Sequence, residues 1–117
     1  MLKNDYSASD DIPLWGKHEY LEFDSAGEMM SWVSEDKRTF NLSHKVYEAM
    51  MDCLQNDISE CIVATLEIKN QTTIDVLIRQ DNFQKILKAY VERLLREEDY
   101  ERLIQIKEET ARFGLEI

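Results

Sequence analysis

The chain has 117 residues, of which 44% are hydrophobic and 32% are charged, a composition typical of one folded domain and not of a fibrous protein. Its net charge of -10 repels phosphate backbones and anionic lipid surfaces, so we expect no direct binding to nucleic acid or to a membrane. A chain of this size buries roughly 65% of its unfolded surface. Little room is left for a deep, water-excluding cleft, which argues against an enzyme.

The sequence carries no sign of export. No apolar run approaches the roughly 20 residues needed to span a bilayer, and the first dozen residues lack the basic start and apolar stretch of a signal peptide. We therefore expect a cytoplasmic protein. The two cysteines, Cys53 and Cys61, fit that compartment as reduced, buried side chains, and they can be bridged only if the fold brings them together.

The N-terminal part divides at its only proline. Residues 1–11 contain few bulky apolar side chains and are predicted to form a disordered acidic tail. Order is predicted to begin near Ile12, and residues 12–117 to form a single α+β domain. Partial alternation of apolar residues after Pro13 predicts a short strand over residues 18–23.

A short helix is predicted after this strand. Asp24 or Ser25 can cap it, and Ser25 and Glu28 have the spacing of a capping box. Residues 34–38 are charged and are predicted to be a solvated connector.

A second helix is predicted to follow the connector. Asn41 or Ser43 can accept its first free backbone N–H groups, and its apolar positions repeat with a helical period as far as Gln55. Asn56 and Asp57 are predicted to end it. One face of this helix must be buried.

Residues 60–80 show the clearest strand pattern. Apolar residues alternate on both sides of the segment KNQT, which predicts an antiparallel β-hairpin. The two apolar faces coincide only with a three-residue loop, either Lys69–Gln71 or Asn70–Thr72, and the first of these pairs Leu66 with Ile74. An isolated hairpin is marginal in water, so its other face must also be covered. Three apolar residues are predicted to lie on that other face: Cys61, Val63 and Leu77.

The last 37 residues are predicted to form a helical hairpin. Asp81 is predicted to cap a third helix, which has the cleanest amphipathic pattern of the chain. Asp99 can cap a fourth, which Gly114 ends in the left-handed conformation. The predicted class is α+β: a small antiparallel β-hairpin or three-stranded sheet packed against about four helices.

Motifs for catalysis or ligand binding are not found. The three glycines lie too far apart to cradle a phosphate, and His18, His44 and the cysteines lack the close pairs that zinc sites use. His44 is expected in the first turn of its helix, and the cysteines in apolar elements where burial makes a thiol inert. We predict no catalytic residue, metal or cofactor.

The preferred hypothesis is a non-enzymatic protein that binds another protein with a basic surface. Acidic groups would steer the encounter and aromatic anchors would hold the complex. One version is an inhibitor that blocks the basic groove of a nucleic-acid-binding protein, as small phage-encoded anti-defence proteins do. The candidate partner-binding residues are Asp10, Asp11, Trp15, Tyr20, Glu22, Phe23, Asp24, Glu28 and Trp32.

Two other classes of function stay open. The chain can be an assembly subunit that forms a homodimer through its β-hairpin, which would cover the free strand edge and the half-apolar face. It can also be a small enzyme of an unrecognised type. A closed pocket holding a histidine or carboxylate with a strongly shifted pKa would indicate the enzyme.

Overall fold

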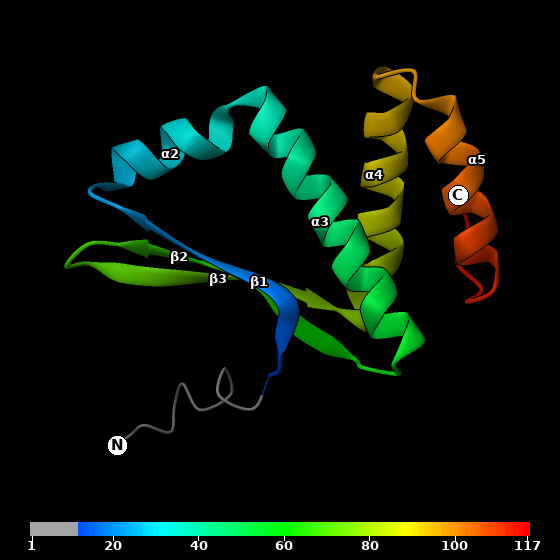
Figure 1. The fold of residues 1–117 in the computed structure, drawn as a ribbon, viewed down its shortest axis with the longest axis horizontal. Helices are drawn as coiled ribbons and strands as arrows, with labels where there is room; N and C mark the ends of the chain where they lie inside the picture. The colour runs from blue at the N-terminus through cyan, green and yellow to red at the C-terminus, as the bar shows by residue number, and fades with distance from the viewer. Residues whose placement is uncertain (1–11) are drawn as a thin grey trace.

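A computed structural model describes residues 12–117 and confirms the α+β class and the C-terminal helix pair (Figure 1). The predicted tail at residues 1–11 lies outside the described residues. The elements, in chain order, are β1 (Leu14–Phe23), α2 (Ala26–Ser34), α3 (Asp36–Gln55), β2 (Glu60–Ile68), β3 (Thr72–Arg79), a short 3-10 helix η1 (Gln80–Asn82), α4 (Phe83–Arg96) and α5 (Tyr100–Ala111).

The sheet is mixed and has the strand order β1-β2-β3. The predicted antiparallel pairing holds for the hairpin of β2 and β3, whereas β1 pairs with β2 in parallel. The parallel pairing is possible because α2 and α3 form the crossover that returns the chain to the same end of the sheet. β1 also begins at Leu14, ahead of the predicted start, because its first residues pair with the start of β2.

The hairpin has the predicted register at its closed end. Leu66 pairs with Ile74, and the three-residue loop Lys69–Gln71 joins the strands. Asn70 takes the left-handed conformation in this loop, with a φ of 60°. Asparagine tolerates that conformation better than a β-branched residue would, which favours this loop over one ending at Thr72.

The open end of the hairpin differs from the prediction because the register shifts between Ile62 and Ala64. The shift is a bulge at Val63, and a bulge moves the residues before it to the other face of the sheet. Cys61 therefore pairs with Ile78, and both are buried in the core under the helices. Val63 is buried in the same core, so the prediction that Cys61 and Val63 lie on the opposite face is wrong.

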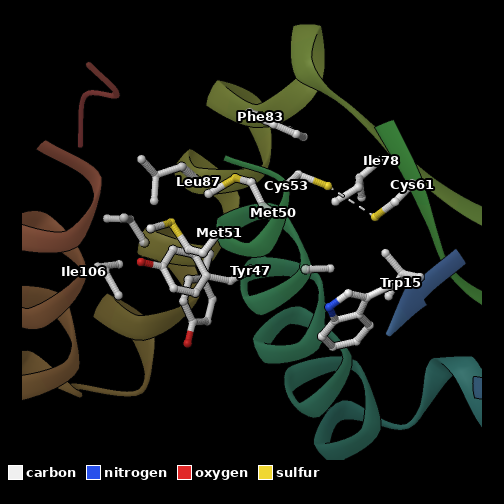
Figure 2. Packing of buried hydrophobic residues seen from close by; sticks show 14 of the residues in the cluster. Trp15, Tyr47, Met50, Met51, Cys53, Cys61, Ile78, Phe83, Leu87 and Ile106 are labelled. Carbon is white, nitrogen blue, oxygen red and sulfur yellow. Dashed lines mark hydrogen bonds between the residues drawn. The ribbon is translucent and has the colours of Figure 1, made fainter. Parts of the chain in front are cut away.

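Two apolar clusters lie along the sheet. The larger one joins α3, α4 and α5 to the start of β1 and β2, and includes Trp15, Tyr47, Met50 and Leu87 (Figure 2). The smaller one lies under α2 at the other end of the sheet (Figure 1). The radius of gyration is 15.6 Å, against about 13 Å for a spherical domain of this size. The end of the sheet that carries α2 therefore projects from the main core.

α3 begins at Asp36, ahead of the predicted starts at Asn41 and Ser43, so residues 34–38 are not a connector. The reason is a contact with α4. Arg93 donates hydrogen bonds to the Asp36 carboxylate at 2.9 Å and to its backbone carbonyl at 3.3 Å, and its guanidinium lies 4.6 Å from the ring centroid of Phe40.

The other helix ends are mostly as predicted. Ser25 and Asp99 each accept a hydrogen bond from the backbone N–H three residues further on, at 3.1 and 3.2 Å. Gly114 has a φ of 75° and follows α5. The prediction for Asp81 is wrong, because Asp81 lies within η1 and α4 begins only at Phe83.

Candidate functional site

The structure separates the predicted partner-binding residues into groups. Asp10 and Asp11 lie outside the described residues. Trp15 is only 6% exposed and belongs to the larger core. Tyr20 is 55% exposed, and its hydroxyl donates a hydrogen bond to Glu67 on β2. This bond raises the pKa of Tyr20 to about 12.

Four of the remaining residues line one groove between α2 and the end of β1, which we call the α2 groove. Its volume is about 500 Å³. Asp24 lies in the turn that joins the two elements. A smaller hollow of about 220 Å³ shares three of its residues and extends it toward α3. The α2 groove is lined by Leu21, Glu22, Phe23, Glu28, Ser31, Trp32, Glu35 and Arg38.

Trp32 is the aromatic anchor of the α2 groove. Its ring is half-buried and meets the buried ring of Phe23 edge-on, with 5.7 Å between centroids. The guanidinium of Arg38 lies 5.3 Å from the ring centroid of Trp32. The indole is therefore held in place by its neighbours while part of its surface stays open to a partner.

Three acidic residues around the α2 groove have no basic partner in the part of the chain that the structure describes. The chain contains no lysine or arginine between Lys17 and Lys37. Within residues 12–117, Glu22, Asp24 and Glu28 form no ion pair. Glu28 instead accepts a hydrogen bond from the backbone N–H of Asp24 at 3.3 Å. These three carboxylates therefore leave a local excess of negative charge around the α2 groove.

The single basic group in the lining of the α2 groove is largely compensated. Arg38 lies 3.7 Å from a carboxylate oxygen of Glu35 and stacks on Trp32. Nearer the middle of β1 the charges are paired across to α3. Those pairs are Lys45 with Glu19 and Lys17 with Glu48.

A second, polar hollow of about 330 Å³ lies between α3 and α5. His44 contacts the hydroxyl of Tyr90, which also accepts a hydrogen bond of 3.2 Å from Arg102. Tyr47 donates a hydrogen bond of 2.8 Å to Glu109. These residues come from three helices, so no spacing in the sequence reveals the cluster. His44 lies well inside α3 and not in its first turn, because the helix starts early.

Burial sets the protonation of this cluster. It lowers the pKa of His44, and the nearby Arg102 guanidinium lowers it further. Burial also raises the pKa of Tyr47 and of Tyr90. All three are therefore neutral hydrogen-bonding groups near neutral pH. The lining of this hollow includes no serine, threonine or cysteine that could act as a nucleophile, and its bonds join α5 to α3 and α4.

A polar row crosses the helix-free face of the sheet. Thr65 donates a hydrogen bond of 2.8 Å to Asp75 on β3 and lies 2.9 Å from Nε2 of His18 on β1. Because a hydroxyl has one proton and Thr65 gives it to Asp75, His18 is the donor to Thr65. The histidine therefore cannot take a proton from this hydroxyl, and the row joins strands without forming a catalytic triad.

Comparisons with protein-family models, with curated proteins and with solved structures give no match. Among residues 12–117, no three histidine, cysteine or acidic side chains are arranged to hold a metal ion. No helix in this range has both the length and the apolar character needed to cross a membrane. The compartment stays a prediction.

Proposed function

We propose that this chain is a non-enzymatic protein that binds a protein with a basic surface through the α2 groove. The observation that supports this most directly is the position of a half-buried tryptophan, Trp32, in one groove with acidic residues that form no ion pair among residues 12–117. Two of these acidic residues, Glu22 and Glu28, are among those that line the groove, and Asp24 lies in the adjoining turn.

Charge and aromatic surface have separate roles in this proposal. Unpaired carboxylates attract a basic partner before contact and raise the association rate. A tryptophan that its neighbours already hold loses little conformational freedom when it is covered, and tryptophan is enriched among the residues that dominate binding energy. Trp32 is therefore the proposed anchor.

The shape of the molecule favours a partner with a concave surface. The end of the sheet that carries α2 stands away from the larger cluster and is packed by a small core of its own. A narrow acidic projection fits the basic groove in which a protein binds nucleic acid, because the projection and the nucleic acid both carry negative charge. We therefore propose inhibition of a nucleic-acid-binding protein, as in phage-type anti-defence proteins.

The test is capture of a partner by the wild-type chain and by two charge-matched variants. In the groove variant, amides replace the three carboxylates and keep an oxygen that can accept the hydrogen bonds around the start of α2. After a partner is identified, its association rate is measured at several salt concentrations. The groove variant carries Glu22→Gln, Asp24→Asn and Glu28→Gln.

The control variant removes the same charge from α4 and α5. Its three glutamates are exposed and form no ion pair among residues 12–117. We expect only the groove variant to associate about tenfold more slowly at low salt and to show a flatter salt dependence. Equal rates for the two variants would overturn the proposal. The control variant carries Glu92→Gln, Glu101→Gln and Glu108→Gln.

A homodimer through β3 is a second candidate. Within the described sheet β3 is an edge strand, and Ile74 is 42% exposed. In such a dimer the β3 strands of the two copies would pair antiparallel, with the two-fold axis at Leu77. Asp75 of one copy would then lie opposite Arg79 of the partner subunit, with both side chains on the same face of the joined sheet. Sedimentation across a concentration series decides it, because a chain that stays monomeric throughout excludes this dimer.

A further inference from the structure

Cys53 and Cys61 come from different elements and meet inside the larger core. Cys53 lies in the last turn of α3 and Cys61 near the start of β2. Their sulfur atoms are 3.4 Å apart and point toward one another, as the dashed line in Figure 2 shows. Both cysteines are free thiols in this structure.

We propose that Cys53 and Cys61 are a redox-active pair that forms an intramolecular disulfide with glutathione disulfide as the oxidant. A disulfide bond is about 2.05 Å long, so the sulfurs need to approach by about 1.4 Å from their present contact. At van der Waals contact no other atom can lie between them.

The surroundings favour a disulfide over a metal ion. The neighbours drawn around the pair include Trp15, Ile78 and Phe83, which offer no metal ligand (Figure 2). Among residues 12–117 no third histidine, cysteine or acidic side chain is arranged to bind a metal ion with the two thiols. A disulfide is apolar and has no need of hydrogen-bond partners, so the core can hold it without the desolvation cost of a buried thiolate.

We expect an oxidant to reach the pair through the connector between α3 and β2, which separates the two cysteines along the chain. Residues 55–59 are exposed, and Asp57 within them has a φ of 55°, in the left-handed region. Burial raises the pKa of Cys53, and it raises the pKa of Cys61 to about 12. Oxidation therefore requires local opening of this connector, because the thiolate is the reacting form.

The reaction is two successive thiol–disulfide exchanges. The Cys53 thiolate attacks one sulfur of glutathione disulfide, which forms a mixed disulfide and releases one glutathione thiolate. The Cys61 thiolate then attacks the Cys53 sulfur of that mixed disulfide and releases the second glutathione. The two protein thiols are oxidised, glutathione disulfide is reduced to two glutathione molecules, and the two protons pass to the released thiolates.

The test brings the full chain to equilibrium in glutathione buffers of increasing oxidised fraction, from two starting materials. One is the reduced native chain. The other is chain oxidised while unfolded in urea and then refolded into the same buffers. After an alkylating quench, the intact mass and a peptide map report the state of each cysteine. The two starting points remove slow access as an explanation of the result.

We expect both starting materials to converge on a monomer that has lost two hydrogens, resists alkylation and links Cys53 to Cys61. The variants Cys53→Ser and Cys61→Ser should carry only a glutathione adduct. Two alkylatable thiols at equilibrium in the most oxidising buffer, or a glutathione adduct on the wild type, would overturn the proposal. The pair lies outside the α2 groove, so this outcome is independent of the proposed function.

Discussion

The indole Nε1 of Trp15 donates a hydrogen bond of 2.7 Å to Oδ2 of Asp52. The bond joins the start of β1 to the last turns of α3, 37 positions further along the chain. It satisfies the polar atom of a residue that is otherwise packed in the larger core. A tryptophan that resembles a binding anchor in the sequence is thus used for folding.

Replacing Trp15 by phenylalanine tests this role. The variant keeps an aromatic ring but loses the hydrogen bond to a carboxylate, and we expect the free energy of unfolding to fall by about 1.5–3 kcal/mol. Urea unfolding followed by circular dichroism measures the change. Partner binding should be unaffected, and a variant of normal stability with weakened binding would place Trp15 in the interface instead.

Replacing Trp32 by alanine tests the anchor of the α2 groove. We expect at least about 2 kcal/mol of lost binding free energy, or roughly a 30-fold rise in Kd, because a central tryptophan is removed. The matched control is Met30→Ala on the same helix, since Met30 is 56% exposed and does not line the α2 groove. Similar losses from both variants would contradict the assignment.

His44 predicts a pH dependence of stability. Its pKa in the folded chain is lowered from the ordinary 6.5 by burial, so the unfolded chain binds the proton more readily. This contribution to stability is present above the unfolded pKa and is lost as the pH falls from the unfolded pKa through the lower folded pKa. We expect the urea midpoint to fall between about pH 7.5 and about pH 5.5, with a smaller fall in His44→Gln. An equal fall in both proteins would assign the effect elsewhere.

Arg93 predicts where α3 begins. Its side chain is 8% exposed and bonds to Asp36 in the first turn of α3. In Arg93→Met we expect amide exchange in residues 39–41 to quicken at least roughly tenfold, which corresponds to about 1.4 kcal/mol. The control is Arg96→Met on the same helix, because Arg96 is exposed and forms no ion pair among residues 12–117. Unchanged exchange in Arg93→Met would show that α3 starts at Asp36 without this contact.

The candidate site was only partly predictable from the sequence. Glu22, Phe23, Glu28 and Trp32 were predicted because acidic and aromatic residues stand close together along one short stretch of the chain. Arg38 was not, since the sequence around it gave no sign that its guanidinium would stack on Trp32. The sequence also did not show that Tyr20 lies apart from the groove, because it did not show which face of β1 is buried.

Short-range sequence patterns predicted the hairpin, its loop and the caps at Ser25 and Asp99, because alternation, turn geometry and capping depend on residues a few positions apart. Only the tertiary structure decided the parallel pairing of β1, the early start of α3 and the bulge at Val63 that turns Cys61 toward Cys53. Each of these depends on the free energy of packing between segments far apart in the chain. The spacing of residues along the chain does not show this free energy.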